Sequence, residues 1–348
     1  MRTSVNRRTF LAGSGALGAS TVFGAPTIVM AAAPKEKLTI AVGSEHALVY
    51  LPWDVAKALG YFDQEGLDVN LIYTKGGTEA GLALISGNVD YSGNAIDHAI
   101  AAADQGKSLV MLADFMDQPG ITILTKPANK GKFPNGASLK GKTIGITSVG
   151  SATDVIAHWA GHRNGLSKDD VKTVGVGGGA TVMAALQGGQ VDVALANDPY
   201  ATLMIRQGRA VPVAELYTAK ATREWLGFSS WCFTGGLTRA DVIAKYPDRT
   251  QKVVNALVRA MKFMATSSGQ KVAAALSDEF RGGASPADWA IAFGHSRPAY
   301  TTVGRINPDA VKNVIEANEF FLGKKLSIDP AKLYDNAFVD KAAKSVHV

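Results

Sequence analysis

The feature that most constrains the fold of this 348-residue chain is an internal repeat. Four short segments recur in the second half with the same or similar residues at a nearly constant offset of 102: 76–77 at 178–179, 83–84 at 185–186, 87–90 at 189–192 and 105–107 at 207–209. Any two β-α-β units share glycine turns, but matches in this order at one offset favour a duplication. The repeat therefore predicts two similar lobes.

Both halves alternate short β-rich runs with helical ones, which indicates an α/β fold. The runs typical of buried strands are 38–42, 69–73, 109–113, 143–147, 171–176, 191–196 and 211–216. Helical patterns at 53–60 and 79–86 separate the strands of the first half. Two such lobes leave a cleft between them, and the carboxyl ends of their parallel strands should face it.

Two segments are suited to cross between the lobes. Residues 114–120 lead into a β-like run at 121–125, and a polar stretch after 216 leads into another at 229–234. From 236 onward the pattern is mostly helical, with helices predicted at 249–266 and 309–322 that pack on the first lobe. The predicted organisation is an export leader at 1–33, a first lobe at 34–118, a second lobe at 119–225, and a return to the first lobe with a helical tail at 226–348.

The leader resembles a twin-arginine (Tat) export signal. Arg7 and Arg8 precede Phe10 and Leu11, an uncharged run extends to residue 30, and three alanines follow at 31–33. An N-terminal membrane anchor is the alternative, although glycines and a proline interrupt the run. We expect the mature protein to be exported and periplasmic.

Charge and cysteine content narrow the function classes. The chain carries a net charge of +6, but residues 1–33 contribute three arginines and no acid, which leaves 33 basic and 30 acidic residues. This balance argues against a nucleic-acid partner. A single cysteine, Cys232, excludes an internal disulfide and a Cys-based zinc site.

An ordered series of motifs is similar to a known family. It comprises 38–42 (LTIAV), 55–62 (VAKALGYF), 65–69 (EGLDV), 76–77 (GG), 86–90 (SGNVD), 139–145 (LKGKTIG) and 189–194 (GQVDVA). The series resembles the nitrate/sulfonate/taurine (SsuA/TauA, NMT1-like) substrate-binding proteins of ABC importers. The resemblance implies the type II periplasmic-binding-protein fold, in which two α/β lobes joined by two crossing segments close around one small molecule and then dock on a membrane permease. Because the family serves nitrate, alkanesulfonates, aromatic carboxylates and pyrimidines, the ligand stays open.

The predicted ligand site consists of loops that precede helices. Free backbone N–H groups at a helix start attract anions, glycines allow close approach, and hydroxyls add donors. The ligand-binding candidates are Ser44, His46, Gly77, Thr78, Ser92, Asn94, Thr147, Ser148, Ser151, Thr153, Gly179, Asn197, Asp198 and Trp231. Helix capping is the alternative role for each Ser, Thr or Asn, and for Asp198 before Pro199.

No motif for a metal, a cofactor or catalysis is evident. Residues 177–179 are three glycines, but neither a dinucleotide fingerprint nor a phosphate loop surrounds them. His158 and His162 have a zinc-like spacing without a third ligand, and Cys232 has no neighbouring base. His98 could touch ligand or serve as a surface or capping residue. We therefore expect no cofactor, no metal and no catalytic residue.

Three hypotheses about function follow. The first is a monomeric, extracytoplasmic solute-binding protein that captures a small, anionic or zwitterionic molecule and delivers it to an ABC permease. The second is an extracytoplasmic enzyme on the same fold that acts on a pyrimidine-like or aromatic molecule. Relatives similar to the thiamine-pyrimidine synthases use a lysine-bound cofactor, a consumed histidine and a Cys-rich motif, which one cysteine cannot form. The third is a ligand-sensing partner of a membrane receptor.

Overall fold

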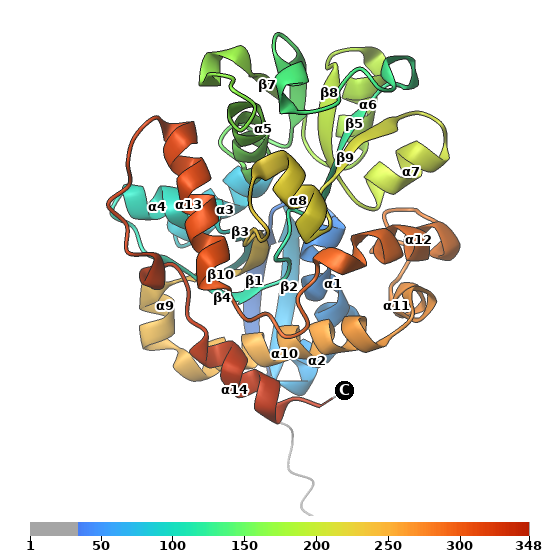
Figure 1. The fold of residues 1–348 in the computed structure, drawn as a ribbon. Coiled ribbons are helices and arrows are strands. Elements are labelled where there is room, and N and C mark those ends of the chain that lie inside the picture. Colours follow the sequence, from blue (N-terminus) through green and yellow to red (C-terminus); the bar gives the residue numbers. More distant parts are fainter. Residues whose placement is uncertain (1–33, 348) are drawn as a thin grey trace, which may run out of the picture. The chain divides into compact units, whose positions relative to one another are not determined.

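Two five-stranded sheets carry the fold and repeat each other strand for strand (Figure 1). The computed structural model describes residues 34–347, so the predicted export leader at 1–33 lies outside the described residues. Both sheets belong to one compact unit, Lys35–Val348. Their strand orders are β2-β1-β3-β10-β4 and β7-β6-β8-β5-β9. Each sheet with its covering helices is one lobe, which confirms the predicted α/β class with two lobes.

Each sheet has three parallel neighbours and one antiparallel strand inserted before its last strand. The first sheet contains β1 (Glu36–Val42), β2 (Leu67–Tyr73), β3 (Tyr91–Ala95), β4 (Leu109–Asp114) and β10 (Thr234–Arg239). The second contains β5 (Ile121–Thr125), β6 (Thr143–Ile146), β7 (Lys172–Gly175), β8 (Val193–Asn197) and β9 (Val211–Glu215). Strand β10 runs antiparallel to β3 and β4, as β5 does to β8 and β9. Since β3 and β8, and likewise β4 and β9, begin 102 residues apart, the sequence repeat is a structural duplication.

The lobes exchange their antiparallel strands. Strand β5 follows β4 in the chain but lies in the second sheet, and β10 follows β9 but lies in the first. The same side-chain bond fastens both: Thr238 Oγ donates to the Asp90 carbonyl at 2.6 Å, and Thr125 Oγ donates to the Asp192 carbonyl at 2.8 Å. The two aspartates end the repeated motifs at 87–90 and 189–192. The duplicated unit therefore includes a strand that completes the opposite lobe.

Backbone hydrogen bonds pair the two crossing segments side by side. Phe115 N donates to Thr234 O, Phe233 N to Met116 O, and Trp231 N to Asp117 O, at 2.7 to 3.0 Å. A rotation of one lobe relative to the other must therefore pass through two coupled segments.

Two local predictions were wrong. The second crossing strand begins at Thr234, where the predicted run at 229–234 ends, and Ser92 and Asn94, predicted in a loop, lie in the buried strand β3. Both strands contain glycines that neighbouring atoms require: a Cβ on Gly235 would lie 2.1 Å from Ala113 O, and one on Gly93 would lie 2.6 Å from Trp53 Nε1. Because tertiary contacts select these glycines, neither strand shows a hydrophobic pattern.

Fourteen α-helices cover the sheets within the described residues. They are α1 (Leu51–Ala58), α2 (Tyr61–Gln64), α3 (Gly77–Ile85), α4 (Asp97–Asp104), α5 (Ala152–His162), α6 (Ala180–Gly188), α7 (Tyr200–Arg206), α8 (Ala219–Leu226), α9 (Ala240–Lys245), α10 (Pro247–Thr266), α11 (Gly269–Ala275), α12 (Pro286–Ser296), α13 (Pro308–Leu322) and α14 (Ala337–Ser345). Helices α10 and α13 confirm the two predicted tail helices. No helix among residues 34–347 is both long and apolar enough to span a membrane.

The tail helices cover the first lobe and reach the second. Proline at the first position starts α10, and its buried stripe, which includes Val254, Leu257 and Met261, packs on α1 and α2. Helix α13 contacts both α4 and α5. The buried apolar side chains form one large cluster that draws on both lobes and a smaller one around Leu124, Leu186 and Met204. Each such Leu or Val contributes about 1.5–3 kcal/mol through burial.

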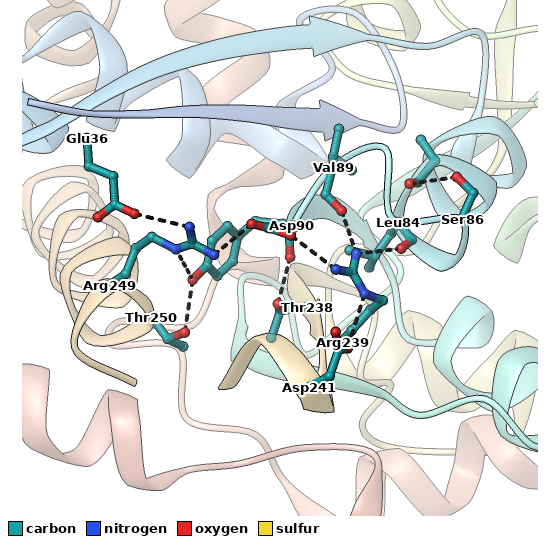
Figure 2. A network of polar contacts seen from close by, with 12 residues as sticks. Glu36, Leu84, Ser86, Val89, Asp90, Thr238, Arg239, Asp241, Arg249 and Thr250 are labelled. Atoms are coloured by element: carbon teal, nitrogen blue, oxygen red, sulfur yellow. Dashed lines mark hydrogen bonds and ion pairs between the residues drawn. The ribbon is translucent and has the colours of Figure 1, made fainter. Parts of the chain in front are cut away.

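A network around Asp90 ties four parts of the first lobe together (Figure 2). The Asp90 carboxylate binds Arg239 at 3.1 Å and Arg249 at 2.6 Å, and Arg249 also reaches Glu36 at 3.1 Å. Arg239 further donates to the carbonyls of Leu84 and Val89. The network thus joins the start of β1, the turn before β3, the end of β10 and helix α10.

A second polar cluster joins helix α12 to the second lobe. His295 on α12 places Nε2 2.8 Å from Glu215 Oε1 and Nδ1 3.4 Å from Asp198 Oδ2. These two carboxylates raise the pKa of His295 to about 10. Ser296 Oγ also donates to Asp198 at 2.8 Å. Since α12 packs on α11, and α11 contacts α1, this helix pair bridges the two lobes beside the crossing segments.

Replacing Asp90 with alanine should lower the free energy of unfolding by about 2 kcal/mol, because two largely buried guanidinium groups lose their shared carboxylate. Urea denaturation measures the loss. Asp241→Ala is the matched control, since Asp241 is 74% exposed and contacts only Arg239, so its cost should stay below about 0.5 kcal/mol. Equal losses in the two variants would contradict the structural role of Asp90.

The His295 contacts should stabilise the protein in a pH-dependent manner. A folded-state pKa of about 10, above the ordinary value of 6.5, means that the stabilisation is fully present below pH 6.5 and is lost as pH rises toward 10. The difference in unfolding free energy between wild type and His295→Gln should therefore be large at pH 6 and shrink toward pH 10. The exposed His347→Gln serves as the control. A difference that does not change with pH would contradict the ion pairing.

Candidate functional site

The carboxyl ends of both sheets face a small cavity. Its lining residues follow or end strands β1, β3, β6 and β8, or lie on helix starts and the second crossing: Gly43, Ser44, Val49, Tyr50, Gly77, Ala95, His98, Thr147, Ser151, Ala152, Thr153, Asn197 and Phe233. The cavity volume is about 20 Å³, which is enough for about one water molecule. The two lobes are thus closed against each other at this point.

The repeated glycine pairs allow this close approach. A Cβ on Gly76 would lie 2.8 Å from Ser148 Oγ in the opposite lobe, and a Cβ on Gly178 would lie 2.6 Å from Ser44 Oγ. The two contacts are equivalent, because Ser44 follows β1 as Ser148 follows β6. Thr78 Oγ adds a hydrogen bond to Ser148 Oγ at 3.0 Å. Because the two halves share this spacing, a glycine of each lobe lies against a serine of the other.

Two helices begin at the cavity, one from each lobe. Gly77 starts α3, and Ala152 starts α5. Within the described residues, the N–H groups of Gly77, Thr78, Ala152 and Thr153 make no hydrogen bond. Free N–H groups at helix starts carry partial positive charge, so both lobes present donors to the same space.

Three hydroxyls on the second lobe form a closed triangle. Thr147 Oγ, Ser151 Oγ and Thr153 Oγ lie 2.9 Å from one another, and Thr153 Oγ also accepts from Thr147 N at 3.0 Å. The triangle stabilises the loop before α5 and turns its hydroxyls toward the cavity lining. It also uses the hydroxyl protons internally, which leaves lone pairs as the accessible groups.

Two buried polar atoms at the cavity have no partner within the described residues. They are Nε2 of His98 and Oδ1 of Asn197. Burial lowers the pKa of His98 to about 4, so the imidazole is neutral at pH 7. Nε2 points toward Gly77 at the start of α3, since a Cβ there would lie 2.6 Å from it. Unpartnered buried groups of this kind are typical of sites that meet a ligand.

The structure places the predicted site residues in three groups. Six line the cavity: Ser44, Gly77, Thr147, Ser151, Thr153 and Asn197. Two make the contact between the lobes at its rim: Thr78 and Ser148. Six lie outside the lining: His46, Ser92, Asn94, Gly179, Asp198 and Trp231.

Three residues of the third group, Ser92, Asn94 and Asp198, make hydrogen bonds within the fold. Ser92 Oγ donates to the Ala41 carbonyl, and Asn94 Nδ2 donates to the Gly77 carbonyl, which holds the start of α3. Asp198 accepts from Thr202 N and Tyr217 OH in addition to the α12 contacts described above. The bond from Thr202 N satisfies an N–H group in the first turn of α7, which fits the alternative capping role for Asp198, although Pro199 holds the N-cap position.

The other three members of the third group pack against aromatic rings. His46 is buried with a φ of +47°, its ring 4.6 Å from that of Tyr73. Gly179 lies against the ring of Tyr200, and Trp231 is fully buried beside Phe228.

Several lining residues escaped the sequence-based prediction: Gly43, Val49, Tyr50, Ala95, Ala152 and Phe233, with His98 left open. Tyr50 and Phe233 belong to no recognisable motif, and they meet only because the second crossing returns to the first lobe. His98 carried a usable signal, since it is the second residue of α4, the helix that follows β3.

The described residues show little support for a metal site or a cysteine nucleophile. No group of three or more His, Cys, Asp or Glu side chains in residues 34–347 could hold a metal ion. His158 and His162, the pair with zinc-like spacing, pack instead on Phe321 and Phe320 of α13. Burial raises the pKa of the Cys232 thiol, which makes it a poor nucleophile.

A larger groove of about 650 Å³ lies elsewhere, between Gly106–Leu109 and Leu326–Leu333. It borders the start of β4, at the edge of the sheet opposite the carboxyl ends of the parallel strands. The cavity between the lobes, where donors and unpartnered polar atoms meet, is therefore the stronger candidate site.

Three known proteins are similar to this chain. A 4-amino-5-hydroxymethyl-2-methylpyrimidine phosphate synthase of Candida albicans (strain WO-1) is 25% identical to this chain. The alignment covers 66% of this chain and 67% of the length of the synthase. A solved protein of Bordetella bronchiseptica RB50 is 28% identical, with a TM-score of 0.82 over 89% of this chain and 98% of its own. The alkanesulfonate-binding protein SsuA of Xanthomonas axonopodis pv. citri, bound to MOPS, is 21% identical, with a TM-score of 0.68. The match covers 89% of this chain and 99% of the SsuA chain.

The last of these likenesses shows the fold alone and confirms the periplasmic-binding-protein architecture. The family model described as NMT1/THI5 like matches residues 44–268, which span both lobes and both crossing segments. Since this match covers more than half of the sequence, the chain belongs to the NMT1/THI5-like family.

Proposed function

We propose that this protein is an extracytoplasmic solute-binding protein that captures a small molecule between its lobes and delivers it to an ABC permease. The observation that carries the proposal is the cavity itself: both lobes line it, and each contributes a helix start with free N–H donors. No bond needs to be broken for this function. Binding and release require only that the lobes close and part.

The size of the cavity supports a mechanism by lobe motion. Small-molecule sites commonly measure about 300–1,000 Å³, whereas this cavity measures about 20 Å³. A ligand must therefore enter while the glycine–serine contacts at Gly76 and Gly178 are open. The paired crossing segments are the natural hinge, because they alone connect the two sheets along the chain.

The comparisons favour a binding protein with an extracytoplasmic location. SsuA is named as alkanesulfonate-binding and was solved with MOPS, and it matches nearly the whole of this structure. The twin-arginine leader predicted at residues 1–33 is consistent with export. A monomeric state and transient docking on a permease belong to the same proposal.

The enzyme alternative rests on the similarity to the Candida synthase and on His98 in the cavity. A lysine-bound cofactor, which this alternative implies, does not fit the site, because none of the lining residues is a lysine. The Cys-rich motif is also absent from a chain with one cysteine. Binding without turnover is therefore the better supported function.

Filling the cavity should abolish ligand binding. Ala152→Leu adds an isopropyl group at the start of α5, where the available space holds about one water molecule. Small molecules that co-purify with the wild-type protein, identified by mass spectrometry after denaturation, should be missing from this variant. Thermal stabilisation by added sulfonates, carboxylates or pyrimidines should be lost with them.

Ala219→Leu is the matched control, since Ala219 also starts a helix but is exposed. Circular dichroism verifies that both variants fold. Turnover of a bound compound, or a wild-type protein that neither carries nor binds any small molecule, would contradict the proposed function.

A further inference from the structure

No charged side chain lines the cavity between the lobes. None of its thirteen lining residues is Asp, Glu, Lys or Arg. The N–H groups at the starts of α3 and α5, which have nine and eleven residues, supply positive potential to the cavity. Such donors bind a carbonyl or a singly charged acid group, but they offer less than an arginine would to a doubly charged one.

The cavity also presents hydrogen-bond acceptors, which require a donor on the ligand. Asn197 is 9% exposed, and its Oδ1 has no donor within the described residues. The hydroxyl triangle of Thr147, Ser151 and Thr153 uses its protons internally and presents lone pairs. Neutral His98 adds one further acceptor or donor, depending on its tautomer. A ligand that brings only acceptors would leave Asn197 Oδ1 buried and unpaired.

A buried acid near the lining strengthens this requirement. Asp97 begins α4, is 2% exposed and lies near Tyr50 of the lining. Burial raises the pKa of Asp97 to about 6. A ligand with high negative charge would be disfavoured beside this carboxylate, whereas an N–H or O–H donor would be favoured there. Asp198, the neighbour of Asn197, is already paired with His295.

We propose that the site selects a small organic acid or amide that carries its own N–H or O–H donor, and that Asn197 discriminates against anions without one. The acceptor group of the ligand faces the starts of α3 and α5, and its donor faces Asn197 Oδ1. Nitrate and unsubstituted alkanesulfonates lack the donor. This inference rests on the proposed function and specifies the ligand class of the same site.

Matched probe pairs test the proposal by isothermal titration calorimetry on the full chain. The pairs are ethanesulfonate and 2-hydroxyethanesulfonate, propanoate and 2-hydroxypropanoate, and benzoate and 4-aminobenzoate, with nitrate as a further donor-free anion. The donor-bearing member that binds best should have a Kd at least tenfold below that of its partner, or about 1.4 kcal/mol. Nitrate or a donor-free member that binds as tightly would overturn the inference while leaving the proposed function intact.

Two variants test whether Asn197 causes the difference in Kd between donor-bearing and donor-free probes. Asn197→Leu should bring the ratio of the two Kd values close to one, whereas the exposed Asn88→Leu should keep it. A ratio unchanged in Asn197→Leu would remove Asn197 from its role. If Asn197→Leu fails to fold, the comparison within each probe pair on the wild-type protein still decides the ligand class. Absence of binding by every probe and of any co-purified molecule would overturn both the inference and the proposed function.

Discussion

The exchange of strands β5 and β10 is the constraint on which the rest of the structure depends. Each lobe is completed by a strand that arrives from the other, and the Asp90 and Asp192 carbonyls fasten these strands through the same threonine bond. Neither sheet can form fully without its partner, so the lobes fold as one unit. The same exchange creates two paired crossing segments, and these limit the lobes to a hinge-like motion.

Closure of the cleft follows from the symmetry of the duplication. Gly76 and Gly178 each meet a serine of the other lobe, and helices α3 and α5 direct free N–H groups from the two lobes into one space. Because no charged side chain lines that space, recognition depends on hydrogen-bond geometry more than on net charge. Buried hydrogen bonds are costly to leave unmade, which makes such a site selective even when each bond is weak.

Sequence patterns predicted the lobes better than the site. The strand at 109–113 was recognisable because it is a continuous apolar run whose residues are all buried. Strand β3 was missed because Trp53 and the start of α3 require Gly93 and Asn94 there, and these residues have the composition of a loop. Ser44, Thr147, Ser151 and Asn197 reached the lining because strand ends and helix starts are local features. Tyr50 and Phe233 did not stand out, because only the returning crossing segment brings them together.

The sequence by itself determined the duplication, the α/β class and the positions of the helix starts, since repeats and hydrophobic periodicity are local properties of the chain. The tertiary structure alone decided which polar groups meet. It placed Asp198 in a buried cluster with His295 and left Asn197, its neighbour, unpartnered at the cavity. Two adjacent residues thus differ, one with hydrogen-bond partners and one without. The reason is that strand ends, crossing segments and α12 come together from distant parts of the chain, and burial determines which polar atoms find a partner.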